Sequence, residues 1–224
     1  MILSKLKSSL IVSCQAPSDS PLYQPEIIAL MAKTAVYRGA KGVRIDSPSH
    51  IQAVRQLLPD TPIIGLWKQT NLNSSVYITP RFADAVAVSE AGADIIAIDA
   101  TNRSRPEGED LGEIISKIKT QLGKLVMADV DTLHNAFQAV AKGADFVGTT
   151  LYGYTEETRH LTPPNFDLVA QLKAKLDCPV ICEGGIKTPQ QAQMAMVEGA
   201  FAVVVGTAIT GIDLQTQAYV NFLK

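Results

Sequence analysis

The eight residues Gly-Ala-Asp-Ile-Ile-Ala-Ile-Asp at positions 92–99 combine the signals that decide the fold. Gly92-Ala93 ends a helical pattern, since glycine readily takes the left-handed conformation that closes a helix. Residues 94–99 then form a short run that is apolar on both faces, which is typical of a strand buried in a parallel sheet. The stretch therefore predicts a helix that passes directly into a parallel strand.

The same pattern recurs along the whole chain. Gly-Ala pairs also stand at residues 39–40, 143–144 and 199–200, each just before an even-numbered predicted strand. Strands are predicted at residues 9–14, 42–46, 62–67, 94–99, 125–130, 146–150, 179–183 and 202–206, and helical patterns lie near residues 26–37, 49–58, 80–91, 111–121, 132–142, 165–176, 188–198 and 214–223. Because each strand is followed by a helix and nothing is left over, we predict one α/β domain over residues 1–224, a closed (β/α)8 TIM barrel with a parallel eight-stranded core.

The composition excludes several classes of protein. Of the 224 residues, 46% are hydrophobic and 19% are charged, which excludes a disordered or coiled-coil chain. The 20 Lys and Arg against 22 Asp and Glu give a net charge of −2, so the chain offers no basic field for a polyanion. We therefore expect no nucleic-acid partner.

The cysteines and the N-terminus bear on the cellular compartment. The chain has an odd number of cysteines, namely Cys14, Cys178 and Cys182. They lie in apolar surroundings and form no CxxC pair, so they indicate neither a disulfide framework nor a zinc cluster. The first seven residues lack the apolar run of a signal peptide, and no later segment is long and apolar enough to span a membrane. These patterns predict a cytoplasmic protein without a membrane partner.

Polar residues stand at the carboxyl ends of the odd-numbered strands. The active site of such a barrel lies at the carboxyl ends of its strands. Gln15, Lys68, Asp129 and Glu183 follow or end the first, third, fifth and seventh strands. Alternate strands contribute side chains to a common layer, so the four side chains are expected to face one point. A single terminal charge can simply mark where the chain meets water, but burying four polar groups without a function is costly.

Lys68 and Glu183 are complementary in chemistry. An ammonium and a carboxylate on either side of a small substrate can exchange protons at carbon if burial brings a pKa value toward neutrality. In this interpretation Asp129 orients Lys68, and Gln15 hydrogen-bonds a substrate carbonyl or hydroxyl. Arg44 at the end of the second strand, and Arg103 and Arg105 in a loop, are available for anionic groups. The two loop arginines fit plain surface charge equally well.

Glycines after the last two strands predict a phosphate site. Gly184 and Gly185 follow the seventh strand, and Gly206 and Thr207 follow the eighth, where barrels of this kind bind phosphate with backbone N–H groups. A plain turn explains a single Gly pair, but two such sites on adjacent strands favour phosphate. No metal is predicted, because none of the three histidines ends a strand and Asp129 and Asp131 lack convergent partners.

Eight motifs, each at a strand end, together resemble a known enzyme family over nearly the whole chain. They are Ser13-Cys14-Gln15-Ala16, Gly42-Val43-Arg44, Ile63 to Lys68, Asp99-Ala100-Thr101 with Arg105-Pro106, Met127-Ala128-Asp129, Gly148-Thr149-Thr150 with Gly153-Tyr154-Thr155, Glu183-Gly184 and Val205 to Thr210. In this order they resemble the N-acylglucosamine-6-phosphate 2-epimerase family. The resemblance implies interconversion of N-acetylmannosamine 6-phosphate and N-acetylglucosamine 6-phosphate in amino-sugar and sialic-acid catabolism, with a sugar phosphate as partner and without a metal or other cofactor.

The resemblance also assigns roles to residues. It carries the catalytic lysine onto Lys68 and a catalytic carboxylate onto Glu183, with deprotonation and reprotonation at the sugar C2. The division of acid and base roles between the two stays open, and Glu183 could instead catalyse ring opening. Predicted substrate contacts are Gln15, Arg44, Asp129, Thr150 and Tyr154, and predicted phosphate contacts are Gly184, Gly185, Gly206 and Thr207.

Two positions depart from the family pattern. Gly185 stands where a longer polar or basic residue often follows Glu-Gly, and Gly211 stands where an Arg often follows Ala-Ile-Thr. The loss of an Arg near the phosphate would weaken the substrate's anchor or shift specificity, although backbone amides at Gly185, Gly206 and Thr207 are available to hold the phosphate.

Other functions remain as alternatives at this point. A Lys at a strand end can form an imine, so a Schiff-base aldolase or another sugar-phosphate barrel enzyme is one. A non-catalytic sugar-phosphate sensor is another, although intact Lys68 and Glu183 disfavour it. Barrels often dimerise, and the sequence leaves a homodimer open.

Overall fold

The computed structural model describes residues 2–223, so the predicted domain of residues 1–224 extends one residue beyond them at each end. Eight parallel strands form a closed barrel in chain order, and β8 pairs with β1 to complete the ring. The strands are β1 (Leu10–Cys14), β2 (Gly42–Asp46), β3 (Ile63–Leu66), β4 (Ile95–Asp99), β5 (Leu125–Asp129), β6 (Phe146–Gly148), β7 (Val180–Glu183) and β8 (Ala202–Val205). The predicted (β/α)8 barrel is confirmed, with every strand within two residues of its predicted bounds.

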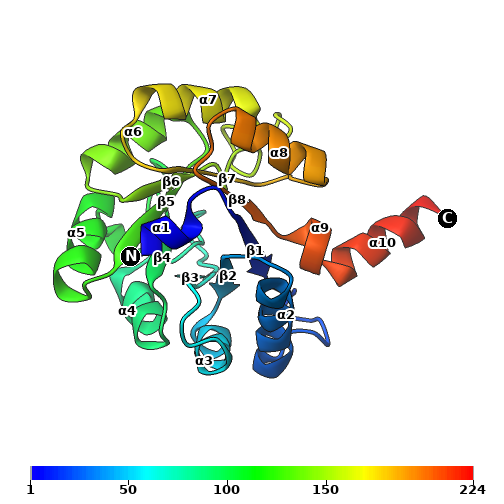
Figure 1. The fold of residues 1–224 in the computed structure, drawn as a ribbon. Helices are drawn as coiled ribbons and strands as arrows, with labels where there is room; N and C mark the ends of the chain where they lie inside the picture. The colour runs from blue at the N-terminus through cyan, green and yellow to red at the C-terminus, as the bar shows by residue number, and fades with distance from the viewer. Residues whose placement is uncertain (1, 224) are drawn as a thin grey trace.

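Helices surround the ring, as Figure 1 shows. They are α1 (Ile2–Leu6), α2 (Pro25–Tyr37), α3 (Pro48–Leu57), α4 (Phe82–Glu90), α5 (Leu111–Gln121), α6 (Leu133–Ala141), α7 (Phe166–Lys175), α8 (Pro189–Val197), α9 (Thr207–Thr210) and α10 (Ile212–Phe222), with a short 3-10 turn η1 (Pro106–Gly108). Among the described residues no helix is both long and apolar enough to cross a membrane.

The Gly-Ala pairs close helices as predicted. Gly39, Gly92, Gly143 and Gly199 all have positive φ, between 95° and 109°. After α2, the N–H of Gly39 donates to the carbonyl of Val36 at 2.9 Å, and the N–H of Ala40 donates to that of Ala35 at 3.1 Å. These two bonds satisfy carbonyls that would be left open at the helix end, and the left-handed glycine turns the chain into the next strand.

The barrel has an inner and an outer apolar core. Inside the ring, side chains such as Ile11, Phe146 and Ile181 pack together, and Leu6 of α1 joins them with none of its surface exposed. In Figure 1, α1 lies across the end of the barrel where the strands begin. A chain segment therefore covers that end, and the cavity described below lies at the opposite one.

Helix α10 differs from the other outer helices. It projects away from the barrel (Figure 1), and none of its residues is buried. The helical pattern predicted at residues 214–223 is confirmed, and this helix extends outward instead of joining the layer of helices around the barrel (Figure 1). Only Gly211 separates α9 from α10, so the chain has no loop with which to turn α10 back onto the sheet.

Candidate active site

A cavity of about 660 Å³ lies at the carboxyl ends of the strands and collects most of the predicted site residues. Its lining includes the residues predicted to be catalytic, four of the predicted substrate contacts and all four predicted phosphate contacts: Lys68, Glu183, Gln15, Arg44, Thr150, Tyr154, Gly184, Gly185, Gly206 and Thr207. Asp129 is missing from this lining because its side chain is fully buried. The structure therefore brings Lys68 and Glu183 to one cavity, as the barrel layering predicts.

Lys68 stands two residues after the end of β3 and is held by residues at the ends of β1 and β2. Its backbone N–H donates to Asp46 Oδ1 at 2.9 Å, and its Nζ donates to Gln15 Oε1 at 2.5 Å. Nζ also lies 4.0 Å from Asp46 Oδ2. Gln15 is fixed in turn, since its Nε2 donates to Ser13 Oγ at 2.9 Å. The Lys68 side chain remains 45% exposed, so its amine can reach a molecule in the cavity.

The expectation that Asp129 orients Lys68 was wrong. Asp46, at the end of β2, takes that place, because the parallel register sets it beside Leu66 at the end of β3. The prediction looked for the partner of Lys68 among the residues that end odd-numbered strands and so passed over Asp46.

Arg44 joins two carboxylates inside the barrel. Its guanidinium donates to both oxygens of Asp129, from NH2 to Oδ2 at 2.6 Å and from NH1 to Oδ1 at 3.3 Å, and its Nε lies 3.1 Å from Glu183 Oε1. The Arg44 and Asp129 side chains are 2% and 0% exposed. Burial opposes the charge on Arg44, but Asp129 and Glu183 overcome this and raise the pKa of Arg44 above its ordinary value. Arg44 is thus a permanent buried cation, within β2 rather than at its end.

Glu183 titrates near neutrality. Burial, and secondarily the negative charge of Asp129, raise the pKa of Glu183 to about 7, while Arg44 and Lys68 act in the opposite direction. The Thr150 hydroxyl lies 2.6 Å from Asp129 Oδ1 and 3.1 Å from Glu183 Oε2, and it has only one proton to donate. A hydrogen bond that Thr150 donates to Glu183 lowers the pKa of that carboxyl, but burial outweighs it. Glu183 can therefore carry a proton near neutral pH.

The glycine-rich segments after β7 and β8 form another wall of the cavity. Gly184 and Gly185 have φ of 101° and 69°, which favours glycine at both positions. Gly206 precedes α9, whose first N–H groups, beginning with Thr207, have no acceptor within the helix. These residues line the cavity, and free backbone N–H groups suit an anion.

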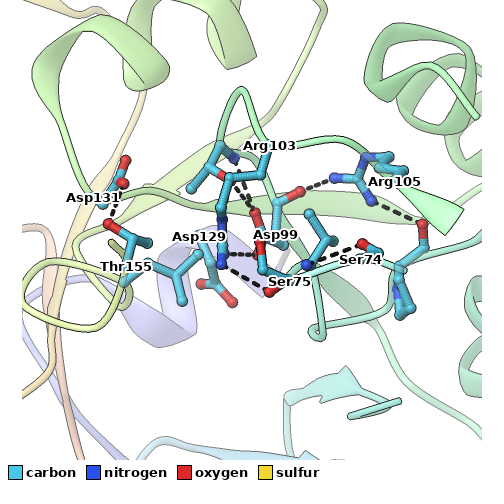
Figure 2. A network of polar contacts seen from close by, with 12 residues as sticks. Ser74, Ser75, Asp99, Arg103, Arg105, Asp129, Asp131 and Thr155 are labelled. Atoms are coloured by element: carbon cyan, nitrogen blue, oxygen red, sulfur yellow. Dashed lines mark hydrogen bonds and ion pairs between the residues drawn. The ribbon is translucent and has the colours of Figure 1, made fainter. Parts of the chain in front are cut away.

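Arg103 and Arg105 serve a different cluster, around Asp99 at the end of β4 (Figure 2). Arg103 pairs with the Asp99 carboxylate and donates to the Ser75 carbonyl at 2.7 Å. Arg105 is buried and donates to the carbonyls of Asp99 and Pro80. Neither arginine lines the cavity, because both hold the loops after β3 and β4 together.

Several cavity residues had not been selected from the sequence. Ser13, Tyr77, Lys187, Gln215 and Tyr219 also line the cavity. Burial, followed by the charges of Asp129 and Asp99, raises the pKa of Tyr77 to about 12. Tyr77 lies in the long loop after β3, and Gln215 and Tyr219 lie on α10, so no strand-end rule could have found them. Lys187 does have a signal, since it follows the Gly184-Gly185 turn closely and precedes a helix start.

The described part of the chain contains no group of three or more His, Cys, Asp or Glu side chains that could hold a metal ion. Asp131 is engaged by Asn135 Nδ2 at 2.7 Å and by the Thr155 hydroxyl at 2.7 Å, the latter visible in Figure 2. Its role is structural, as predicted, and the absence of a metal cofactor stays a prediction.

Comparison of the whole sequence with known proteins gives one consistent result. The family model described as "Putative N-acetylmannosamine-6-phosphate epimerase" matches residues 28–224. A Synechococcus elongatus protein named "Putative N-acetylmannosamine-6-phosphate 2-epimerase" is 61% identical over 223 residues, which cover 99% of this chain and 96% of that protein. A Caldanaerobacter subterraneus protein of the same name is 43% identical over 224 residues, 100% of this chain and 94% of that protein.

Solved structures agree with the sequence comparison. The N-acetylmannosamine-6-phosphate 2-epimerase from Clostridium perfringens matches with a TM-score of 0.94 and 36% identity, covering 99% of this chain and 96% of that one. A thiamine phosphate pyrophosphorylase from Pyrococcus furiosus matches with a TM-score of 0.65 and 18% identity, over 95% of this chain and 91% of that one. The second likeness shows the shared barrel fold alone.

Proposed function

The chain belongs to the N-acetylmannosamine-6-phosphate epimerase family, and from this premise we propose that it interconverts N-acetylmannosamine 6-phosphate and N-acetylglucosamine 6-phosphate. The observation that carries the proposal is that Lys68 and Glu183 line the same cavity. The two sugars differ only in configuration at C2, so the reaction must remove a proton from one face of that carbon and return it to the other. The reaction belongs to the breakdown of amino sugars and sialic acid.

Lys68 is the base at C2 in this proposal. In the open-chain aldose, C2 is adjacent to the C1 carbonyl. In its unprotonated form the Lys68 amine takes the C2 proton, and the electron pair of the C–H bond forms a C1–C2 double bond while the negative charge moves to O1. Return of a proton to the opposite face of C2 gives the epimer and restores the carbonyl. Polar groups that converge in the cavity stabilise the enolate oxygen.

Glu183 is the second acid–base group. A carboxyl with a pKa of about 7 can both donate and accept a proton near neutral pH. It either returns the proton to the second face of C2 or moves the proton that opens the sugar ring. Exchange of the C2 hydrogen with solvent separates these roles. If Glu183 returns the proton to C2, Glu183→Gln loses epimerisation but keeps exchange of the C2 hydrogen. If Glu183 opens the ring, the rates of epimerisation and of exchange fall together.

The neighbouring residues bind the substrate or support this pair. Gln15, Arg44, Thr150 and Tyr154 line the cavity and supply the polar contacts to the sugar. Asp129 does not reach the cavity, so we place it behind Arg44, where it fixes the guanidinium that faces Glu183. The backbone at Gly184, Gly185, Gly206 and Thr207 receives the phosphate, whose binding energy holds the reacting carbon in place.

Turnover measured by proton NMR tests the proposed function. Wild-type protein mixed with N-acetylmannosamine 6-phosphate should produce N-acetylglucosamine 6-phosphate, and Lys68→Ala should abolish this while leaving the circular dichroism spectrum unchanged. Lys175→Met is a suitable control, because that exposed lysine does not line the cavity. Binding of the sugar phosphate without turnover would instead support a sensor.

Borohydride trapping separates this mechanism from that of an aldolase. A Schiff-base enzyme would form an imine between Lys68 and the substrate carbonyl, and reduction would leave a covalent adduct visible by mass spectrometry. The epimerase mechanism predicts no adduct on Lys68.

We also propose that the protein works as a homodimer in which α10 of each copy packs on the other. Its apolar side chains Ile212, Leu214, Tyr219 and Phe222 are 56–93% exposed. An apolar groove of about 570 Å³, lined by residues such as Val12, Ile27 and Met31, lies unfilled beside α2, where an eighth outer helix would pack. Light scattering should give twice the mass of one chain, and a chain ending at residue 210 should give the monomer mass.

Location and domain organisation complete the proposal. We propose a location in the reducing cytoplasm, because the odd number and apolar surroundings of the three cysteines indicate no disulfide framework. We propose that residues 1–224 form one domain that needs no cofactor.

A further inference from the structure

The phosphate end of the cavity raises a question of charge. A phosphate monoester carries nearly two negative charges at neutral pH, and partial charges on backbone N–H groups offset them only in part. The lining contains three basic side chains, those of Arg44, Lys68 and Lys187. Which of them is available to the phosphate depends on what each already binds.

Arg44 and Lys68 are already engaged elsewhere. Both ends of the Arg44 guanidinium face carboxylates, and its side chain is 2% exposed, so moving it toward a phosphate would strand Asp129 as a buried charge. The Lys68 amine donates to Gln15 and lies close to Asp46, and the proposed reaction needs it at C2. Neither cation is free for the phosphate.

The backbone also excludes side chains from Gly185 and Gly211, two glycines in the segments that follow β7 and β8. A Cβ atom on Gly185 would lie 2.6 Å from the carbonyl group of Pro163, and Gly185 has a φ of 69°. A Cβ atom on Gly211 would lie 2.7–2.8 Å from atoms of Thr207. With the backbone in this conformation, neither position can supply a cation, so the charge has to come from another residue.

Lys187 is positioned to supply it. It stands two residues after Gly185, and the buried Ile186 between them anchors this turn to the core. The N–H of Lys187 donates to Gln191 Oε1 at 2.7 Å, which ties its backbone to the first turn of α8. Its side chain is exposed and lines the cavity together with Gly184, Gly206 and Thr207. Within residues 2–223, its ammonium forms no ion pair with a carboxylate.

We infer that Lys187 is the phosphate-binding cation of this chain and so sets its preference for a phosphorylated sugar. The inference rests on the proposed function. The Lys187 ammonium meets the phosphate across the Gly184-Gly185 turn and replaces the basic groups that the backbone excludes at residues 185 and 211. Because Lys68 and Glu183 carry out proton transfer in the proposed mechanism, Lys187 contributes to binding rather than to the chemical step.

The test compares Lys187→Met, which keeps the length of the side chain but removes its charge, with Lys187→Arg, which keeps the charge. For N-acetylmannosamine 6-phosphate, Lys187→Met should raise KM about tenfold and leave kcat within about twofold, as expected for loss of a charge-assisted hydrogen bond. Inorganic phosphate, used as a competitive inhibitor, should bind this variant about tenfold more weakly. Lys187→Arg should stay within about threefold of wild type, and Lys175→Met should match wild type.

Each result has a distinct meaning. If the wild type turns over and Lys187→Met keeps the wild-type KM and phosphate inhibition, Lys187 is an ordinary surface lysine and this inference is wrong while the epimerase function stands. If kcat falls and KM does not change, Lys187 acts in the chemical step, which also contradicts the inference. If the wild type shows no turnover at all, the proposed function is wrong, and the inference about Lys187, which rests on it, is wrong as well.

Discussion

Two clusters at the same end of the barrel contain the same kinds of residue. They differ in whether their carboxylate can be reached from the cavity. In one, Arg44 joins Asp129 and Glu183, and in the other Arg103 and Arg105 bind Asp99. Burial raises the pKa of both Glu183 and Asp99. The difference is access, because the Glu183 side chain is 12% exposed and lines the cavity, whereas that of Asp99 is fully buried and does not.

The comparison shows that a shifted pKa does not identify a catalytic group by itself. Structural ion pairs and catalytic acids are perturbed by the same burial and the same neighbouring charges. A group that also faces a cavity can act on a substrate. Substitutions in the two clusters should therefore have different consequences.

Loss of Arg44 should have the largest effect of the four substitutions, because it lowers both stability and turnover. Arg44→Met would leave Asp129 and Glu183 as two buried carboxylates without their shared cation, and breaking a buried ion pair in this way costs about 3–5 kcal/mol. We expect a loss of this size in the free energy of unfolding by urea, together with a fall in kcat of at least about a hundredfold. A variant with near wild-type stability would mean that the cluster is less tightly coupled than its geometry indicates.

Loss of Arg105 should affect stability alone. Arg105→Met removes the donor to two buried carbonyls, which costs about 1–3 kcal/mol for each group left unsatisfied. The turnover of the folded fraction should stay within about threefold of wild type, because Arg105 does not line the cavity. A large fall in kcat at full folding would contradict the division into a structural and a catalytic cluster.

Glu183→Gln should change how stability depends on pH. The pKa of Glu183 is raised to about 7 from an ordinary value of 4.5, so the folded protein binds this proton more tightly than the unfolded chain. Wild-type stability from this group is therefore lost as pH rises from about 4.5 to 7, while a glutamine is indifferent to pH. Relative to wild type, the variant should gain about 1–3 kcal/mol between pH 5 and pH 8 in urea unfolding. A constant difference across this range would show that Glu183 has an ordinary pKa.

Thr150→Val should give the smallest effect. The change removes the hydroxyl that connects Asp129 and Glu183 but keeps the size of the side chain and leaves the Arg44 pair in place. We expect a loss of about 1 kcal/mol in stability, the usual value of a single hydrogen bond, and a fall of about tenfold in kcat. A fall as large as that of Arg44→Met would make Thr150 a direct participant in proton transfer.

The sequence predicted the fold well because strong local signals repeat along it. Apolar runs such as Ile95 to Ile98 and the Gly-Ala helix ends specify eight similar units, and parallel pairing then orders them around a ring. The path of α10 could not be predicted in the same way. Its pattern specifies a helix, but whether that helix packs on its own barrel depends on the connection at Gly211, which periodicity does not describe.

The main residues of the candidate site were predicted from the sequence, but the hydrogen bonds and ion pairs between them were not. Strand ends brought Lys68 and Glu183 to one cavity, since side chains of alternate strands share a layer. The partner of Lys68 was assigned to Asp129 and proved to be Asp46, because which carboxylate meets which cation depends on strand register and side-chain length. The loop residue Tyr77 reaches the cavity through a turn whose conformation no strand pattern encodes.

The most direct test of the account is the fate of the C2 hydrogen in heavy water. Wild-type protein incubated with N-acetylmannosamine 6-phosphate in deuterium oxide should place deuterium at C2 of the recovered sugars and at no other carbon. Lys68→Ala should place none there, while Arg105→Met should keep the exchange. Epimerisation by the wild type with the original hydrogen fully retained at C2, or undiminished exchange in Lys68→Ala, would contradict the claim that Lys68 passes this proton.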